Sequence, residues 1–257
     1  MPTFTVVARP DEISSQLECK LKGDLISNGY TEDSVSPDTV FVVGGDGTFI
    51  YAVHEYLEQL ATAKFYGIHT GTLGFYTDYQ DSDYPEFLEA FLSGRLIETK
   101  YPLLEAKSDH HIYHAINEIR IENAARTQSM HVSVNGEFFE DFRGTGMCIA
   151  TQLGSTAYNR SLGGAVLQEG LPLVELTEIS GIHHNKYRSL GAPFVMQDNV
   201  VLNFESEDYQ GALLGADSDV FPLDGETFVT VRKCPDVCVH MLKGRRISYF
   251  ERLTTLF

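Results

Sequence analysis

A glycine-rich turn with a single carboxylate inside it is the part of the sequence best suited to chemistry. Gly44, Gly45, Asp46 and Gly47 follow an apolar run at residues 40–43, and a helical pattern comes next. Glycines let the backbone approach a ligand closely, and the N-terminus of a helix attracts phosphate. A carboxylate would repel phosphate, so Asp46 needs a separate task, such as ordering a metal ion or accepting a proton from a hydroxyl nucleophile. This combination predicts phosphoryl transfer, and an ordinary turn is the alternative.

The overall charge limits the partners that the chain can have. It carries 19 Lys and Arg against 36 Asp and Glu, which gives a formal charge of −17. This balance argues against nucleic acid and against an anionic membrane as partners. It also repels ATP, so a phosphate site would need local N–H donors, a basic side chain and Mg²⁺ or another divalent cation. Arg143, next to Gly144, is the best local cation.

Possible metal ligands occur in two incomplete groups. Cys234 and Cys238 lack a second Cys or His pair at zinc-finger spacing, and among His110, His111 and His114 only the first and last share a strand face. We therefore expect no metal site from either group.

The cysteine content and the hydropathy pattern bear on location. Four cysteines in 257 residues are too few and too scattered for a disulfide framework. No signal peptide precedes Thr3, and no apolar stretch approaches the ~20 residues of a membrane-spanning helix. These features predict a cytoplasmic protein.

The first hundred residues alternate strand and helix patterns. The predicted strands cover residues 4–8, 40–43 and 65–68, and the predicted helices cover residues 12–28, the stretch from the glycine turn to about 60, and 84–92. Repeated strand–helix units predict a parallel sheet covered by helices, with ligands at the carboxyl ends of the strands. A second glycine-rich turn, residues 67–75, would lie at the same edge.

From about residue 97 the pattern becomes rich in strands. The predicted strands cover residues 111–121, 130–134, 137–142, 200–204, 228–232, 237–242 and 247–250, and Asn135-Gly136 is a hairpin signal. The chain is therefore expected to divide into an α/β domain (1–97), a β-rich domain (98–245) and a last segment (246–257) that could return to the first domain.

Two polar groups in the second half suit the recognition of a nucleotide. Asn117 and Glu118 lie in a predicted strand, and an amide with a carboxylate can hold the two hydroxyls of a ribose. A solvated strand face is the alternative. The segment 151–164 carries hydroxyls, an amide, a guanidinium and an aromatic ring between glycines, which suits sugar and carboxamide recognition. A plain loop before a helix capped by Ser155 or Thr156 would also fit this segment.

These motifs together resemble the NAD kinase family. Gly44-Gly45-Asp46-Gly47-Thr48, Asn117-Glu118 and Gly154-Ser155-Thr156-Ala157-Tyr158 occur in the order and rough spacing of that family, and Gly71-Thr72-Leu73-Gly74-Phe75 fits its second glycine-rich turn. The resemblance runs from about Val40 to Asp217 and is closest to the compact bacterial enzymes. It implies an α/β amino-terminal domain, a carboxyl-terminal β-sandwich, and a homotetramer or homodimer. The implied reaction is Mg²⁺-dependent phosphoryl transfer from ATP, or polyphosphate, to the 2′-hydroxyl of the adenosine ribose of NAD, giving NADP.

The resemblance also implies roles for individual residues. Asp46 would activate the 2′-hydroxyl, Phe75 would pack near the adenine, and Asn117 and Glu118 would bind ribose hydroxyls. The phosphate loop would be shaped by Gly44, Gly45 and Gly47. The dinucleotide site would take in Arg143, Thr145, Thr156, Ala157, Tyr158, Asn159, Arg160 and Ser161, with Ser180 and Tyr187 as further candidates.

Two other functions fit part of the sequence. Diacylglycerol and sphingosine kinases share the Gly-Gly-Asp-Gly loop, but the acidic charge and the polar segment 154–158 disfavour an acyl substrate. A non-catalytic NAD(P)-binding regulator is favoured only by Thr145, and the intact Asp46 argues against it.

The chain departs from the family pattern in two places. Arg143-Gly144-Thr145-Gly146 stands where the family usually has Arg-x-Asp-Gly, and Thr151-Gln152-Leu153-Gly154 stands where it usually has Thr-Pro-Thr/Ser-Gly. Neither change touches Asp46, so the chemistry should survive. We expect the two departures to affect the affinity or the selectivity for the dinucleotide.

The substitution Thr145→Asp should tighten the binding of NAD. A charge-assisted contact contributes roughly 1.5–3 kcal/mol before compensation, although a new carboxylate could also divert Arg143 from a phosphate. We expect little change in the apparent KM for ATP. Calorimetric titration of both proteins with NAD tests this prediction. Unchanged or weaker binding would show that Thr145 does not occupy a functional position in the dinucleotide pocket.

Overall fold

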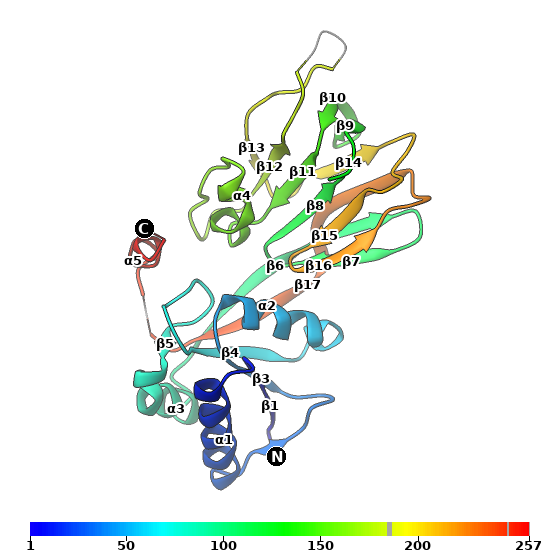
Figure 1. Cartoon of the computed structure of the whole chain (residues 1–257). Helices are drawn as coiled ribbons and strands as arrows, with labels where there is room; N and C mark the ends of the chain where they lie inside the picture. The colour runs from blue at the N-terminus through cyan, green and yellow to red at the C-terminus, as the bar shows by residue number, and fades with distance from the viewer. Residues whose placement is uncertain (184–186, 246, 257) are drawn as a thin grey trace. The chain divides into compact units, whose positions relative to one another are not determined.

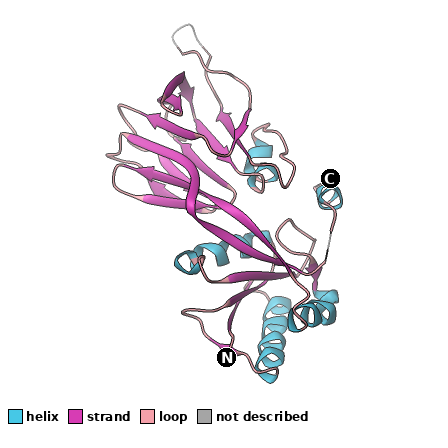
Figure 2. Ribbon diagram, turned by 180° about the vertical axis from the view of Figure 1, so that it is seen from behind, coloured by secondary structure: helices cyan, strands magenta, loops and turns pink. Residues whose placement is uncertain are grey.

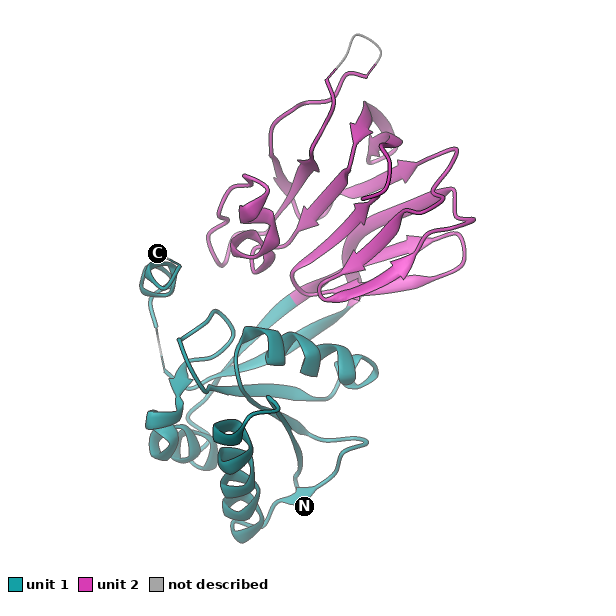
Figure 3. Cartoon of the chain, in the orientation of Figure 1, with its two compact units in different colours: residues 1–101, 237–257 teal, residues 102–236 magenta. Residues whose placement is uncertain are grey.

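Two strands are shared between the two compact units of the chain. The computed structural model describes residues 1–183, 187–245 and 247–256. Unit 1 consists of Met1–Tyr101 and Val237–Phe257, and unit 2 of Pro102–Asp236 (Figure 3). Strands β6 (Ile97–Ser108) and β17 (Phe228–Lys243) contribute residues to both units. The boundaries predicted from the sequence lie at the start of β6 and just after the end of β17.

Unit 1 contains the predicted parallel sheet. Its strands are β1 (Thr3–Ala8), β2 (Thr31–Glu32), β3 (Thr39–Val43), β4 (Lys64–His69) and β5 (Tyr79–Gln80). They run in the order β2-β1-β3-β4, with β5 and the end of β17 also paired in parallel to β4. The carboxyl ends of β3 and β4 therefore lie side by side, and both glycine-rich turns begin there.

Helices cover both faces of this sheet, because the strands bury apolar side chains on both faces (Figure 1). The helical elements are α1 (Glu12–Ser27), α2 (Asp46–Glu55), η1 (Leu57–Gln59), η2 (Asp81–Asp83) and α3 (Tyr84–Leu92). Phe41 and Tyr66 pack with residues of α1 and α3, and the Tyr66 ring stacks on Phe87 of α3 at 4.2 Å between centroids. Phe49 of α2 instead contacts Phe65, which points to the opposite face.

Unit 2 is a β-sandwich (Figure 2). One sheet is antiparallel throughout, in the order β13 (Phe194–Gln197), β12 (Leu173–Ile179), β11 (Gly146–Ala150), β8 (Glu118–Glu122), β15 (Leu213–Ala216) and β16 (Asp219–Pro222). The facing strands are β10 (Glu137–Gly144), β9 (Gln128–Val134), β14 (Val201–Glu205), β17, β6 and β7 (Ile112–Ala115). Ile149 and Leu176 of the first sheet join Val132 and Phe204 of the second in one core. The predicted fold class, an α/β domain with a parallel sheet plus a β-sandwich, is confirmed.

Four predicted strands differ from the structure. The pattern at residues 111–121 is divided into β7 and β8, because the N–H groups of Ile116 and Asn117 donate to the Asp217 carboxylate and leave the ladder. The segments 228–232 and 237–242 are one continuous strand, β17. The strand predicted at residues 247–250 is wrong: this region enters helix α5 (Tyr249–Thr254), which is anchored by the buried Arg252.

Candidate functional site

Asp46 is fixed between the two glycine-rich turns of unit 1. It is the first residue of α2, directly after Gly44 and Gly45. Its carboxylate accepts hydrogen bonds from the main-chain N–H of Phe75 (2.9 Å to Oδ2, 3.1 Å to Oδ1) and of Tyr76 (3.2 Å to Oδ1). Because the donors are backbone groups, the carboxylate is oriented without depending on a mobile side chain. The structure thus brings Asp46 and Phe75 together.

Two glycines of these turns are required by close packing. A Cβ on Gly74 would lie 2.1 Å from Oδ1 of Asp46, and a Cβ on Gly44 would lie 2.4 Å from Oγ1 of Thr48. Gly47 differs, because it is exposed and no described atom lies within 4 Å of an added Cβ. The packing of the chain therefore does not explain Gly47, whereas Gly44 and Gly74 let the turns close around the carboxylate.

His69 is a site residue that the sequence reasoning missed. It is buried at the end of β4, its Nδ1 lies 3.3 Å from Oγ1 of Thr77, and its ring is close to Gly45. Burial lowers the pKa of His69, while the nearby Asp46 carboxylate opposes this shift. The imidazole is therefore neutral at pH 7. Its position could have identified it, since ligands bind at the carboxyl ends of parallel strands.

The second glycine-rich turn is held by an arginine from the end of the chain. Arg252 of α5 donates from Nη1 to the carbonyls of Gly74 (2.9 Å) and Thr77 (2.6 Å), and from Nη2 to the Asp78 carboxylate. Asp78 and Arg252 are both buried, and Asp78 also accepts from the N–H of Gly244 at 3.1 Å. The two carbonyls that Arg252 holds, at positions 74 and 77, lie on either side of the residues whose N–H groups bind Asp46.

A second cluster lies in unit 2 around Asn117 and Glu118. The Asp217 carboxylate accepts from the N–H groups of Ile116 (2.8 Å), Asn117 (2.7 Å) and Glu118 (3.1 Å). Asp217 adopts a φ of 53°, and its own N–H donates to the Glu118 carbonyl at 3.0 Å. The carboxylate accepts the backbone hydrogen bonds that a neighbouring strand would otherwise accept. It therefore fixes the backbone of Asn117 and Glu118 at the start of β8. The role of Asp217 could not be predicted from local sequence patterns, because the contact joins residues about a hundred positions apart.

Glu118 is the polar group in this cluster that most needs a ligand. It is 5% exposed, and within the described part of the chain its Oε2 has no hydrogen-bond partner. Burial, and then the negative charge of Asp217, raises the pKa of Glu118 to about 7, against the opposing effect of Arg120. A buried carboxyl oxygen without a partner is costly unless a bound molecule satisfies it.

The segment 151–158 packs directly on this cluster. Thr151 donates from Oγ1 to the Ile116 carbonyl (2.7 Å) and from its N–H to the Asn117 carbonyl (2.8 Å). A Cβ on Gly154 would lie 2.1 Å from the Asn117 carbonyl oxygen, so this glycine is required. Tyr158 follows, and the guanidinium of Arg120 lies over its ring at 4.9 Å.

The alternative interpretation of this segment, a helix capped by Ser155 or Thr156, is wrong. The turn η3 (Gly154–Thr156) is followed by α4 (Tyr158–Ser161), whose N-cap is Ala157 without a side-chain cap bond. Ser155 instead donates to the Gln152 carbonyl (2.7 Å) and accepts from the Leu167 N–H (3.0 Å), which ties the loop to itself.

The remaining predicted residues are distributed over unit 2. Asn159 is buried and bonded to Glu175 and Thr177, both at 2.7 Å, so it supports the sheet. Arg143 donates to the Tyr187 hydroxyl at 3.0 Å and lies over its ring. Thr145 is held through its main chain, by bonds with Asn123 and Ile179. Thr156 and Ala157 are partly exposed, whereas Arg160, Ser161 and Ser180 are exposed.

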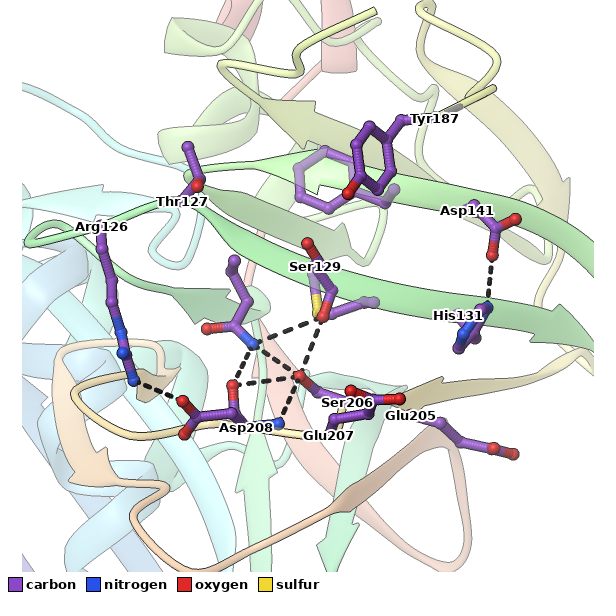
Figure 4. A pocket seen from close by; sticks show the side chains of 13 residues that line it. Arg126, Thr127, Ser129, His131, Asp141, Tyr187, Glu205, Ser206, Glu207 and Asp208 are labelled. Carbon is purple, nitrogen blue, oxygen red and sulfur yellow. Dashed lines mark hydrogen bonds and ion pairs between the residues drawn. The ribbon is translucent and has the colours of Figure 1, made fainter. Parts of the chain in front are cut away.

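A polar pocket on the other sheet of unit 2 includes Tyr187 (Figure 4). Its lining carries the pairs Arg126–Asp208 and His131–Asp141 and the bond from Gln128 to Ser206. Among the predicted site residues, Tyr187 alone lines this pocket in the described part of the chain. Asn117 and Glu118 therefore form a separate cluster from it.

Two protein-family models match this chain. The ATP-NAD kinase N-terminal domain matches residues 5–96, and the ATP-NAD kinase C-terminal domain matches residues 116–241. The chain belongs to the NAD kinase family. The resemblance seen in the sequence motifs is thereby confirmed.

Curated relatives agree with this membership in the NAD kinase family. An NAD kinase of Latilactobacillus sakei is 41% identical over 199 residues, which are 75% of this chain and 74% of the relative. NAD kinase 1 of Bacillus anthracis is 37% identical over 199 residues, 75% of each chain.

Solved structures share the NAD kinase fold. Yeast NADH kinase complexed with NADH superposes with a TM-score of 0.81 at 16% identity, over 99% of this chain and 86% of that one. An NAD kinase from Archaeoglobus fulgidus in complex with ATP gives a TM-score of 0.76 at 21% identity, over 100% and 98% of the two chains. Among the described residues, no helix has the length and apolar character needed to cross a membrane.

The substitution Arg252→Met should destabilise unit 1 by about 3–5 kcal/mol, because the buried Asp78 carboxylate loses the guanidinium that donates to it and, among the described cations, keeps only Lys243, at 3.7 Å. We also expect kcat to fall, since the turn that holds Asp46 loses two carbonyl anchors. The control Arg95→Met removes an exposed pair with Glu89 and should cost at most about 1 kcal/mol. Urea unfolding and steady-state kinetics test this, and equal effects of the two substitutions would contradict the anchoring role.

The substitution Glu118→Gln should stabilise the protein more at pH 8 than at pH 5. The folded-state pKa of about 7 lies above the ordinary value of 4.5, so the folded protein keeps a proton that the unfolded chain has lost, and stability falls as pH rises through this window. The amide removes this loss, which is at most about 3 kcal/mol. Urea unfolding of both proteins at the two pH values measures the difference, and the exposed Glu137→Gln serves as control. A gain independent of pH would contradict the assignment.

Proposed function

We infer that this chain is an NAD kinase, which phosphorylates NAD and so produces NADP. ATP is the phosphoryl donor and NAD the acceptor. The support is the match of both family models, together with relatives that are themselves named NAD kinases. A lipid kinase would share only the first glycine-rich turn, whereas the family match extends through residues 116–241.

We propose that Asp46 orients and deprotonates the 2′-hydroxyl of the adenosine ribose. The observation that carries this proposal is the fixed carboxylate, which accepts two backbone N–H groups at the N-terminus of α2. A carboxylate offers about four lone-pair positions, so a hydroxyl can still donate to it. The proton leaves the hydroxyl as the γ-phosphoryl group arrives.

The phosphates of ATP would bind at the start of α2. Gly44, Gly45 and Gly47 lie there, and the helix directs its first N–H groups and positive dipole end toward the same space. His69 is neutral beside them and adds a hydrogen-bonding group without adding charge. Catalysis would then depend mainly on positioning and on neutralising phosphate charge.

A divalent cation fits this arrangement as part of the ATP complex. Mg²⁺ prefers six oxygen ligands and usually takes several from phosphates and water. In the described part of unit 1, no three Asp, Glu, His or Cys side chains converge. The triphosphate would therefore supply most ligands, with Asp46 as the nearby carboxylate. When bound, the ion offsets the phosphate charge in a chain whose formal charge is −17.

The cluster in unit 2 would hold the dinucleotide. Asn117 offers donors and an acceptor to ribose hydroxyls, and the unpartnered Oε2 of Glu118 would accept from one of them. As the family resemblance implies, Phe75 would pack near the adenine. The other lining residues that we propose are Arg143, Thr145, Thr156, Ala157, Tyr158, Asn159, Arg160, Ser161, Ser180 and Tyr187. For Asn159, burial in the sheet favours an indirect role, in which it fixes the segment that carries Tyr158.

We also propose that the protein assembles as a homotetramer or homodimer, as the family resemblance implies. Light scattering on the purified protein measures the mass directly, and a monomer at micromolar concentration would contradict the proposal. The use of polyphosphate as donor and the cytoplasmic location stay predictions.

The substitution Asp46→Asn tests the assigned base. It should lower kcat by about 10²–10⁴-fold, because the amide keeps the size but cannot take the proton. The dissociation constant for NAD should change little. The matched control is Glu55→Gln, an exposed position on the same helix, which should leave kcat unchanged. Undiminished turnover by the Asn variant would exclude Asp46 as the base.

A further inference from the structure

Three side chains with metal-binding atoms converge in unit 2, and none of the three has been assigned a role above. One ligand atom each from Glu105, His114 and Cys234 lies within 4.8 Å of the other two. We propose that these residues bind a divalent transition-metal ion, with zinc as the best match. This inference does not depend on the kinase activity, because none of the three residues belongs to either proposed cluster.

Strand pairing explains why the three residues meet. Glu105 of β6 and His114 of β7 are direct partners in an antiparallel pair, and β6 also pairs with β17, which carries Cys234. Directly opposite residues on neighbouring strands point to the same face of a sheet. The sequence could not show this convergence, because His114 comes from the incomplete histidine group and Cys234 from the incomplete cysteine group, and strand pairing brings them together.

An arginine already orients the carboxylate of Glu105. Arg232 contacts Oε1 of Glu105 through Nε at 2.9 Å and Nη2 at 2.8 Å. The other oxygen, Oε2, faces His114 and lies 3.8 Å from its Nε2. Arg232 and Cys234 are two residues apart in one strand, so they share a face. Arg232 thus holds one oxygen and leaves the other for an ion, as outer partners of metal ligands do.

The types of ligand select the ion. Thiolate, imidazole and carboxylate are all zinc ligands, and thiolate disfavours Mg²⁺ and Ca²⁺. In a tetrahedral zinc site such ligand atoms lie about 3.3–3.8 Å apart, so the side chains need to move by only about 1 Å. The dication would balance the charges of the Cys234 thiolate and the Glu105 carboxylate. With three protein ligands, the fourth coordination position of a tetrahedral zinc ion is left for water.

The ion would join three neighbouring strands of unit 2. Two of them, β6 and β17, are the strands that also contribute residues to unit 1. Because the unfolded chain does not hold these ligands together, binding would add to the stability of the folded state. A saturating ion should raise Tm by about 5–10 °C at a hundredfold excess over its dissociation constant.

Cobalt titration of the full chain tests the site. After treatment with a chelator and dialysis, Co²⁺ should bind at one equivalent and produce a thiolate-to-cobalt absorption band in the near ultraviolet, which Zn²⁺ then removes. Cys234→Ser should abolish the band. The matched control is Cys238→Ser, because Cys238 lies on the same strand but contacts His240 at 3.4 Å in unit 1. This control should keep the band.

Two further variants protect the test against loss of folding. Circular dichroism checks each protein, and His114→Gln and Glu105→Gln should each weaken Co²⁺ binding at least tenfold while retaining the native spectrum. Absence of the band in the wild-type chain would overturn the proposal. Retention of the band in Cys234→Ser, or its loss in Cys238→Ser, would also overturn it.

Discussion

Carboxylates that accept main-chain N–H groups hold the irregular backbone of both candidate clusters. Asp46 takes the N–H groups of Phe75 and Tyr76, and Asp217 takes those of three successive residues before β8. In each place the backbone leaves a regular ladder, so its donors would otherwise be unsatisfied. Charge-assisted bonds to backbone donors are strong and rigid. The chain can therefore present Asp46, Asn117 and Glu118 in fixed positions on turns.

Buried charged groups in the two clusters serve ligand binding more than they serve the stability of the free protein. Glu118 has a raised pKa and an oxygen without a partner, which a structural role alone would not select. Arg252 and Asp78 form a buried pair whose main consequence is the fixed path of the second glycine-rich turn. The unpartnered oxygen of Glu118 lowers the stability of the free protein, and a ligand that donates a hydrogen bond to it would recover this cost. The same reasoning explains how an acidic chain can bind a polyanion, through local donors.

The parallel sheet, the hairpin and both glycine-rich turns could be predicted because their signals are local. Residues 84–92, for example, form a helix at the predicted bounds. Asp46 was identifiable for the same reason, as a carboxylate out of place among glycines. Asp217 and Arg252 were not, because their roles arise from contacts between distant segments. His69 was missed although its place at the end of a predicted strand was a usable signal. The strand predicted at residues 247–250 failed because a short apolar run cannot be assigned by periodicity alone, and the burial of Arg252 in α5 decides it.

The proposed reaction transfers phosphate to one particular hydroxyl of NAD. The most direct measurement is phosphorus NMR of the product formed by the purified chain from NAD and Mg-ATP. We expect one new phosphomonoester signal that titrates near neutral pH and matches the 2′-phosphate of NADP. Phosphate on another hydroxyl, or consumption of ATP without a phosphorylated dinucleotide, would contradict it.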